Sequence, residues 1–246
     1  MISVLIFLPA IAVAEAITVY VHPVWGISCH VVVFISLIIY SAVLQDRTTQ
    51  RIVLSLSLAP LVRIISLSIP LGKIPEIWRY PIIYVPLLTA ALIALRLLHM
   101  GRREIGISTG FIPTQLGIAL TGVGFGVIEY FILKPAPLIK ELSWQSTWLP
   151  SLIFLLTVGF VEELIFRGVI QRSMTLSFGW KGIIYVSLLF ALLYMGFFSW
   201  LDIILVFWIA VFFGWAVYKT GSLLGVTLSH GLTNIMLYLV VPFLLG

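Results

Sequence analysis

The sequence contains few charged residues and a single cysteine. Only 9% of its 246 residues are charged, against roughly 25% in a typical soluble domain, while 61% are hydrophobic. The shortage of charge extends over the whole chain, which excludes a soluble domain with one membrane anchor. Cys29 has no second cysteine to pair with, so an intramolecular disulfide is excluded and a cysteine-based metal site is disfavoured.

The remaining charge does not indicate a nucleic-acid partner. The net charge is +5, but lysines and arginines in the loops of a membrane protein mainly set its orientation. The expected partner is therefore the lipid bilayer, with no nucleic acid, and the oligomeric state is left open. The four histidines are too scattered for a local metal cluster: His22, His30, His99 and His230.

Long apolar stretches follow one another from the first residue to the last. A bilayer core about 30 Å thick needs roughly 20 apolar residues in a helix. The pattern predicts an all-α fold, a polytopic membrane bundle of eight or nine transmembrane helices with an intramembrane polar site. The first stretch lacks a basic segment before it and is interpreted as a retained span. The stretches lie at about 1–21, 27–44, 52–71, 81–98, 111–133, 150–172, 182–200, 201–218 and 222–245.

The basic residues of the loops are distributed unevenly. Loops 45–51, 96–110, 172–181 and 219–221 carry Arg47, Arg51, Arg96, Arg102, Arg103, Arg172, Lys181 and Lys219. The opposite loops carry only Lys73, Arg79, Lys134 and Lys140. Because the more basic loops usually face the cytoplasm, this bias predicts a cytoplasmic N-terminus in an integral, multi-pass membrane protein.

Two adjacent carboxylates and an arginine interrupt the sixth apolar stretch. Glu162 and Glu163 lie about half-way along it, and Arg167 follows Glu163 by four residues, one helical turn later on the same face. Charged side chains inside a membrane are costly, so they usually pair, face a cavity and mark a function. This cluster is the main candidate for a functional site.

Later stretches place further polar residues at a similar depth. Phe190 and Tyr194 share one helical face, as do His230 and Asn234. With a rise of about 1.5 Å per residue, Glu163, Tyr194 and His230 lie roughly 13, 18 and 12 Å from the helix ends on the side of the basic loops. These residues are therefore expected to line one water-accessible cavity that opens toward the cytoplasm.

Hydrolysis of a peptide bond is one chemistry that such residues can support. A carboxylate can act as general base on a water molecule, and donors directed at the oxyanion are worth roughly 3–4 kcal/mol each in a dry site. Other interpretations remain open for each residue. Glu163 and Arg167 also fit a buried structural pair, His230 and Asn234 fit interhelical hydrogen bonding, and Tyr194 fits a packing residue.

The order of these motifs resembles that of the CPBP intramembrane proteases, which include the CAAX prenyl endopeptidases and bacteriocin-processing or immunity proteins. Glu162-Glu163-x-x-x-Arg167 matches their first motif, and His230-x-x-x-Asn234 matches their third. In the second motif this chain has Tyr194 where the family has histidine. The resemblance covers about 150–238. It suggests a site-bearing core at 111–246, preceded by weakly matched spans at 1–110, within one membrane domain.

The resemblance implies an endopeptidase that hydrolyses membrane-associated or lipidated proteins by glutamate-activated water. Glu162 would be the general base, Glu163 and Arg167 a supporting ion pair, and His230 and Asn234 the oxyanion donors. Tyr194 is a poor base at neutral pH and a weak metal ligand. No cofactor is therefore predicted, and a divalent metal such as zinc, although compatible with the family, is disfavoured.

Two other functions remain alternatives. A catalytically impaired relative could use the same cavity to bind a membrane peptide or protein, and Tyr194 is the feature that keeps this hypothesis open. A transporter would need inverted repeats, and none is visible in the sequence. Glu15 and Arg63 lie inside predicted spans. Three interpretations are open for them: a buried pair, a feature of the substrate path, or snorkelling side chains. Glu129 lies near a helix end, where an interfacial position is expected.

Overall fold

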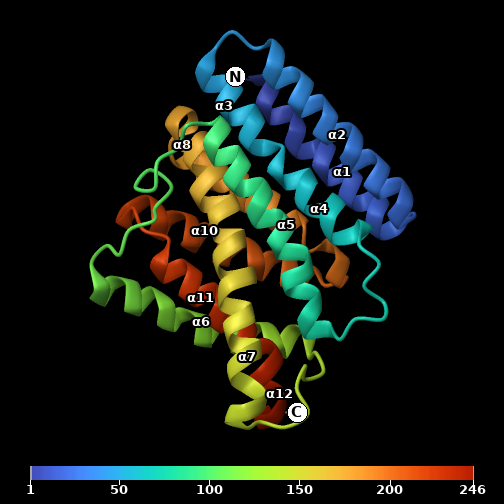
Figure 1. Ribbon diagram of the computed structural model, residues 1–246, viewed down its shortest axis with the longest axis vertical. Coiled ribbons are helices and arrows are strands. Elements are labelled where there is room, and N and C mark those ends of the chain that lie inside the picture. Colours follow the sequence, from blue (N-terminus) through green and yellow to red (C-terminus); the bar gives the residue numbers. More distant parts are fainter. Residues whose placement is uncertain (1, 246) are drawn as a thin grey trace.

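The computed structural model of the protein describes residues 2–245 and is all-α, with 81% of the chain helical and no strand in the described part. Eight helical segments are long and apolar enough to cross a membrane. A ninth, shorter apolar helical segment covers Val4–Tyr20. The prediction of an eight- or nine-helix membrane bundle is therefore confirmed (Figure 1).

The helices follow one another with short connections. The first five are α1 (Phe7–Tyr20), α2 (Pro23–Val43), α3 (Arg47–Leu56), α4 (Leu58–Ser68) and α5 (Glu76–Leu97). They are followed by α6 (Ile112–Leu133), α7 (Trp144–Phe154), η2 (Leu155–Glu162), η3 (Leu164–Gln171) and α8 (Arg172–Phe178). The last are α9 (Trp180–Leu192), η4 (Met195–Phe197), α10 (Trp200–Thr220), α11 (Leu224–Ile235), η5 (Met236–Val240) and α12 (Val241–Leu245), and η1 (Ile2–Ile6) opens the chain.

The predicted span 52–71 is divided in the structure. It begins earlier, at Arg47, and bends at Ser57 between α3 and α4. Pro60 lies just after the bend, where its missing N–H group removes a helical hydrogen bond. Asp46 caps the start of α3, since its carboxylate accepts hydrogen bonds from the backbone N–H groups of Thr48 and Thr49 and from the Thr49 hydroxyl at 2.5 Å. These bonds lower the pKa of the Asp46 carboxyl, the Thr49 hydroxyl contributing most.

The segment that carries the two adjacent glutamates is one continuous rod from Trp144 to Phe178. It begins as α7, becomes the π-helices η2 and η3, and ends as α8. The two π-helical segments meet at Glu163. Because π-helical turns are rare and frequently occur at functional sites, this local geometry is consistent with a functional role for the glutamates.

Small residues bring α6 and α11 together. A Cβ atom added at Gly126 would lie 2.5 Å from the backbone oxygen of Thr233, and the Thr121 hydroxyl is 3.0 Å from that of Ser229. Close approach of this kind is typical of helix packing in membranes. It fixes the position of α11, the helix that carries His230.

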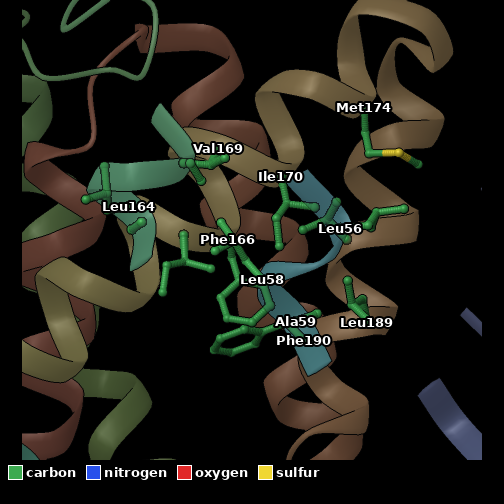
Figure 2. Close-up of a cluster of buried hydrophobic side chains, with 14 of the residues drawn as sticks. Leu56, Leu58, Ala59, Leu164, Phe166, Val169, Ile170, Met174, Leu189 and Phe190 are labelled. Atoms are coloured by element: carbon green, nitrogen blue, oxygen red, sulfur yellow. The ribbon is translucent and has the colours of Figure 1, made fainter. Parts of the chain in front are cut away.

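The main hydrophobic core packs against η3, the second π-helical segment of the rod that carries the glutamates. Figure 2 shows Leu56, Phe166, Ile170 and Leu189 converging from α3, η3 and α9. The rings of Phe166 and Phe190 meet edge to face, with centroids 4.8 Å apart. The core therefore holds η3 firmly between its neighbours, which limits the movement of the charged residues beside it.

Candidate active site

A cavity of about 220 Å³ lies within the bundle beside the adjacent glutamates. Glu162, Tyr194, His230 and Asn234 all line it, so the structure brings these four predicted site residues together. The remaining lining residues are Val62, Arg63, Ser66, Tyr80, Tyr84, Glu129, Val158, Phe166, Phe190, Leu193, Phe197, Val206, Ile209, Phe213, Thr233 and Tyr238.

Two glycines allow the glutamates to approach His230. A Cβ atom at Gly159 of η2 would lie 2.7 Å from the backbone oxygen of Thr227, and one at Gly231 of α11 would lie 2.5 Å from the side chain of Leu155. Both distances are too short for a real Cβ atom, so only glycine permits this spacing. The close contact of η2 with α11 places both glutamates near one imidazole.

Glu163 holds His230 from one side of the ring. Its Oε1 lies 2.8 Å from His230 Nδ1, and its Oε2 lies 3.3 Å from Arg167 Nε. Glu163 has no exposed surface, so its charge depends on these two partners. Because an ionised carboxylate can only accept hydrogen bonds, Nδ1 is the donor. This contact therefore fixes the orientation of the imidazole and directs Nε2 toward Glu162.

Glu162 lies on the cavity side of the same imidazole. Its Oε2 is 3.9 Å from His230 Nε2, and its Oε1 accepts a hydrogen bond from the hydroxyl of Tyr84 on α5. The Glu162 side chain is 13% exposed. It is therefore the carboxylate of the pair that a small molecule in the cavity can reach.

Arg167 is the third charged residue of the polar cluster, after Glu162 and Glu163. Its guanidinium carbon lies 4.6 Å from the ring centre of Phe190 and 5.9 Å from that of Phe213. Aromatic faces attract a cation, most strongly when water is excluded. The predicted Glu163–Arg167 ion pair is present, and Phe190 both belongs to the core and supports the cation.

Asn234 and Tyr194 border the cavity without contacting the glutamates. The Asn234 side chain donates from Nδ2 to the backbone oxygen of His230 at 3.1 Å, which leaves its second N–H available. Tyr194 lies just beyond the end of α9, and its ring packs between Phe190 and Phe197. The position of Tyr194 on the cavity wall fits a site residue, and its aromatic contacts fit a packing residue, so both interpretations stay open.

The first four helices also contribute to the site. The carboxylate of Glu15 faces two nitrogen-bearing side chains, with Oε1 2.6 Å from Arg63 Nε and 3.2 Å from His30 Nε2. Glu15 and His30 are completely buried, whereas Arg63 reaches the cavity wall. The structure therefore shows Glu15 paired with Arg63, and the place of Arg63 on the cavity wall also fits a feature of the substrate path.

Three polar residues of the site were not identified from the sequence. Tyr84 hydrogen-bonds Glu162, yet a tyrosine in an apolar span gives no signal that separates it from a packing residue. His30 was considered only as one of four scattered histidines. Glu129 was expected at the membrane interface, but it is 6% exposed and lines the cavity. Glu129 thus faces the protein interior near the end of α6, and its position at the membrane interface stays a prediction.

The donor atoms do not form a preorganised metal site. Among residues 2–245, no three histidine, cysteine, aspartate or glutamate side chains are placed to hold one ion. Glu162 and His230 could supply two ligands, but Tyr194 occupies the wall where the family motif has histidine. The residues present therefore do not fit a zinc centre of the usual three protein ligands.

The cavity lies toward the helix ends farthest from the basic loops. Ser66 is near the end of α4, Tyr80 near the start of α5, Glu129 near the end of α6 and Phe197 between α9 and α10. The opposite ends of these helices join the loops that carry most of the lysines and arginines. The cytoplasmic opening of the site stays a prediction, and this arrangement shows which helix ends must be tested.

Comparison with known proteins identifies the region that carries these motifs. Residues 144–236 match a family model described as Rce1-like, type II CAAX prenyl endopeptidase Rce1-like. None of the curated proteins or solved structures compared with the chain matches it. The matched residues include Glu162, Glu163, Arg167, His230 and Asn234, and the family indicates a protease-type enzyme in a lipid bilayer. Over residues 144–236 the chain is thus similar to the Rce1-like CAAX prenyl endopeptidases, in agreement with the resemblance of its motifs to the CPBP intramembrane proteases.

Proposed function

We propose that the protein is an intramembrane endopeptidase that hydrolyses peptide bonds of membrane-associated or lipidated proteins, with Glu162 as the base that activates water. One observation supports this most strongly: two adjacent carboxylates face the two nitrogens of one imidazole. Glu163 bonds Nδ1 of His230, whereas Glu162 lies beyond Nε2 with its second oxygen on Tyr84. The buried carboxylate orients the imidazole, and the accessible one is free to react.

A role as oxyanion donor requires a proton on His230 Nε2, the ring nitrogen nearer Glu162. Because Glu163 already accepts from Nδ1, only the protonated form of His230 has an N–H at Nε2. That N–H points toward the cavity.

The reaction then proceeds with water as nucleophile. Glu162 takes a proton from a water molecule, and the resulting hydroxide attacks the carbonyl carbon of the scissile bond. The oxyanion accepts hydrogen bonds from His230 Nε2–H and from the second N–H of Asn234. When the C–N bond breaks, Glu162 returns the proton to the departing amine, so every proton is accounted for within the site.

The two tyrosines have different roles in this scheme. Tyr84 holds Glu162 in place through its hydroxyl, and its own helix lies outside the family-matched region. Tyr194 offers a hydroxyl donor on the wall of the same cavity. No step requires Tyr194 to accept a proton, which suits a phenol at neutral pH. The proposed hydrolysis therefore does not require the histidine that the family has in its second motif.

The alternative is a protein that binds membrane peptides without cleaving them. It is favoured by one feature, the tyrosine at position 194, which lacks the basic nitrogen of histidine. In that case the cavity would recognise a peptide, and the polar cluster would provide binding contacts.

A direct comparison separates the two functions. Wild type and Tyr194→His are purified in detergent and offered a panel of prenylated and unprenylated membrane peptides, with products identified by mass spectrometry and binding by cross-linking. Cleavage by wild type supports the endopeptidase. Binding without cleavage by wild type, together with cleavage by Tyr194→His, supports the binding protein. Neither binding nor cleavage by either form would overturn both.

A further inference from the structure

A second cavity, of about 210 Å³, lies at the end of the bundle that carries the basic loops. It is separate from the cavity beside Glu162 and shares no lining residue with it. The segments around it are the loop before α6, the end of η3, the start of α8 and the end of α10. The polar residues that line it include Arg103, Glu104, Arg167, Gln171 and Arg172.

The rim of this second cavity is strongly positive. Arg103 and Arg172 are exposed, and within residues 2–245 neither side chain has an ion pair. Glu104 is the one acidic residue among those lining the cavity, and it is engaged by Arg51 of α3. The two rim arginines are therefore free to receive an anion from outside the protein.

The floor of the cavity presents buried polar atoms. Arg167 is 2% exposed: its Nε faces Glu163, and its Nη2 is 3.5 Å from the backbone oxygen of Ala210. Nη1 has no hydrogen-bond partner among the described residues. Gln171 donates from Nε2 to the backbone oxygen of Gly214 at 2.9 Å, while its Oε1 has no donor within the described chain. Buried polar atoms without partners carry a free-energy cost.

We propose that this second cavity binds a phosphate group, with Arg103 and Arg172 at the rim and Arg167 and Gln171 at the floor. Guanidinium groups match the oxygens of phosphate through paired hydrogen bonds. A phosphate that carries one proton also offers a donor, which suits the free oxygen of Gln171. The ligand would thus satisfy both kinds of unpaired atom at the floor.

The position of the cavity suggests where the phosphate comes from. Basic pockets between helices at the membrane surface bind the head groups of anionic lipids. Arg103 lies in the loop between α5 and α6, Arg172 is the first residue of α8, and Gly221 follows the end of α10, all on the side of the bundle that carries the basic loops. A phosphomonoester lipid head group or free phosphate would offer the same oxygens, so the two sources are separated by experiment.

Arg167 connects this cavity with the site of proposed hydrolysis. The same side chain faces Glu163 through Nε and lines the second cavity. A phosphate bound there would compete with Glu163 for the positive charge of Arg167. The binding itself does not depend on the proposed hydrolysis and is measured without any peptide substrate.

The test uses the complete protein in phosphatidylcholine nanodiscs, with and without phosphatidic acid, and a third sample with inorganic phosphate. Retained lipid is counted by native mass spectrometry, and the unfolding temperature is followed in the same samples. Wild type is expected to retain phosphatidic acid and to unfold at a higher temperature with it. Stabilisation by inorganic phosphate alone would assign the site to free phosphate instead of lipid.

Variants at the rim decide whether the cavity is the binding site. Arg103→Gln and Arg172→Gln are each expected to weaken retention about fivefold, the factor for one arginine at an anionic surface. Arg102→Gln is the matched control, because Arg102 is an exposed neighbour that does not line the cavity. Equal losses in all three variants, or no retention by wild type, would overturn the proposal. Unchanged unfolding temperatures in pure phosphatidylcholine show that each variant is folded.

Discussion

Replacing Tyr84 with phenylalanine removes one hydroxyl group and keeps the aromatic ring. The hydroxyl donates a hydrogen bond to Glu162 Oε1, while the ring stacks on Tyr80 with centroids 6.4 Å apart. The change therefore deletes the contact that orients the proposed base but preserves the packing of α5. We expect a loss of activity without a comparable loss of stability.

The size of the effect follows from the burial of the pair. A hydrogen bond to a charged group is worth about 1.5–3 kcal/mol. Glu162 is 13% exposed and borders a cavity, so water can replace part of the lost bond and the lower value applies. A change of about 1.5 kcal/mol in the barrier corresponds to roughly tenfold in rate. We therefore expect kcat to fall about tenfold in Tyr84→Phe.

The assay compares kcat and KM for a peptide that wild type cleaves. Because Tyr84 contacts the base, we expect kcat to fall while KM changes little. Tyr80→Phe is the matched control: Tyr80 lies one turn earlier on α5 and lines the same cavity, but its hydroxyl bonds no described residue. Equal kcat values for wild type and Tyr84→Phe, or an equal fall in Tyr80→Phe, would refute the proposed role of the hydrogen bond.

Three further predictions concern the rest of the bundle. Glu15→Gln leaves the cation of Arg63 without its carboxylate and should cost about 3 kcal/mol of stability, visible as a lower unfolding temperature; an unchanged temperature would contradict this. Asp46→Ala should lower the unfolding temperature near neutral pH. Because the folded pKa of Asp46 is lowered, the difference in unfolding temperature between wild type and the variant should disappear as the pH falls through that pKa. A difference that grows in acid would contradict this prediction. In a Cys29→Ser background, Ser66→Cys should react with an impermeant maleimide from the side opposite the basic loops, whereas labelling from the other side alone would support the opening predicted from the sequence.

The sequence was most informative where polar residues repeat at helical spacing inside apolar spans. Glu163 and Arg167 are four residues apart and form the expected ion pair. His230 and Asn234 share a helical face and both border the cavity. Because a buried charge must find a partner, the positions of the intramembrane charges predicted where the structure places this polar cluster.

Other parts of the site depend on contacts that no local pattern encodes. Tyr84 reaches Glu162 across 78 positions of the chain, and nothing near it in the sequence distinguishes it from other tyrosines in apolar spans. The π-helical turns around Glu163 arise from tertiary packing, including the approach that Gly159 and Gly231 allow. Helical periodicity placed Tyr194 within a span, and the candidate span does reach Phe197, but the regular α-helix α9 ends two residues before Tyr194.

The central claim is that Glu162 activates the water that hydrolyses the peptide bond, and Glu162→Gln tests it most directly. Glutamine keeps the shape of the side chain and can still contact Tyr84, but it cannot accept the proton. Rates are measured by mass spectrometry on the peptide panel, with Glu129→Gln as a control that changes another buried carboxylate of the same cavity. We expect Glu162→Gln to lower the rate at least about 100-fold and Glu129→Gln to retain most of it. Cleavage by Glu162→Gln at the wild-type rate would show that Glu162 is not the base.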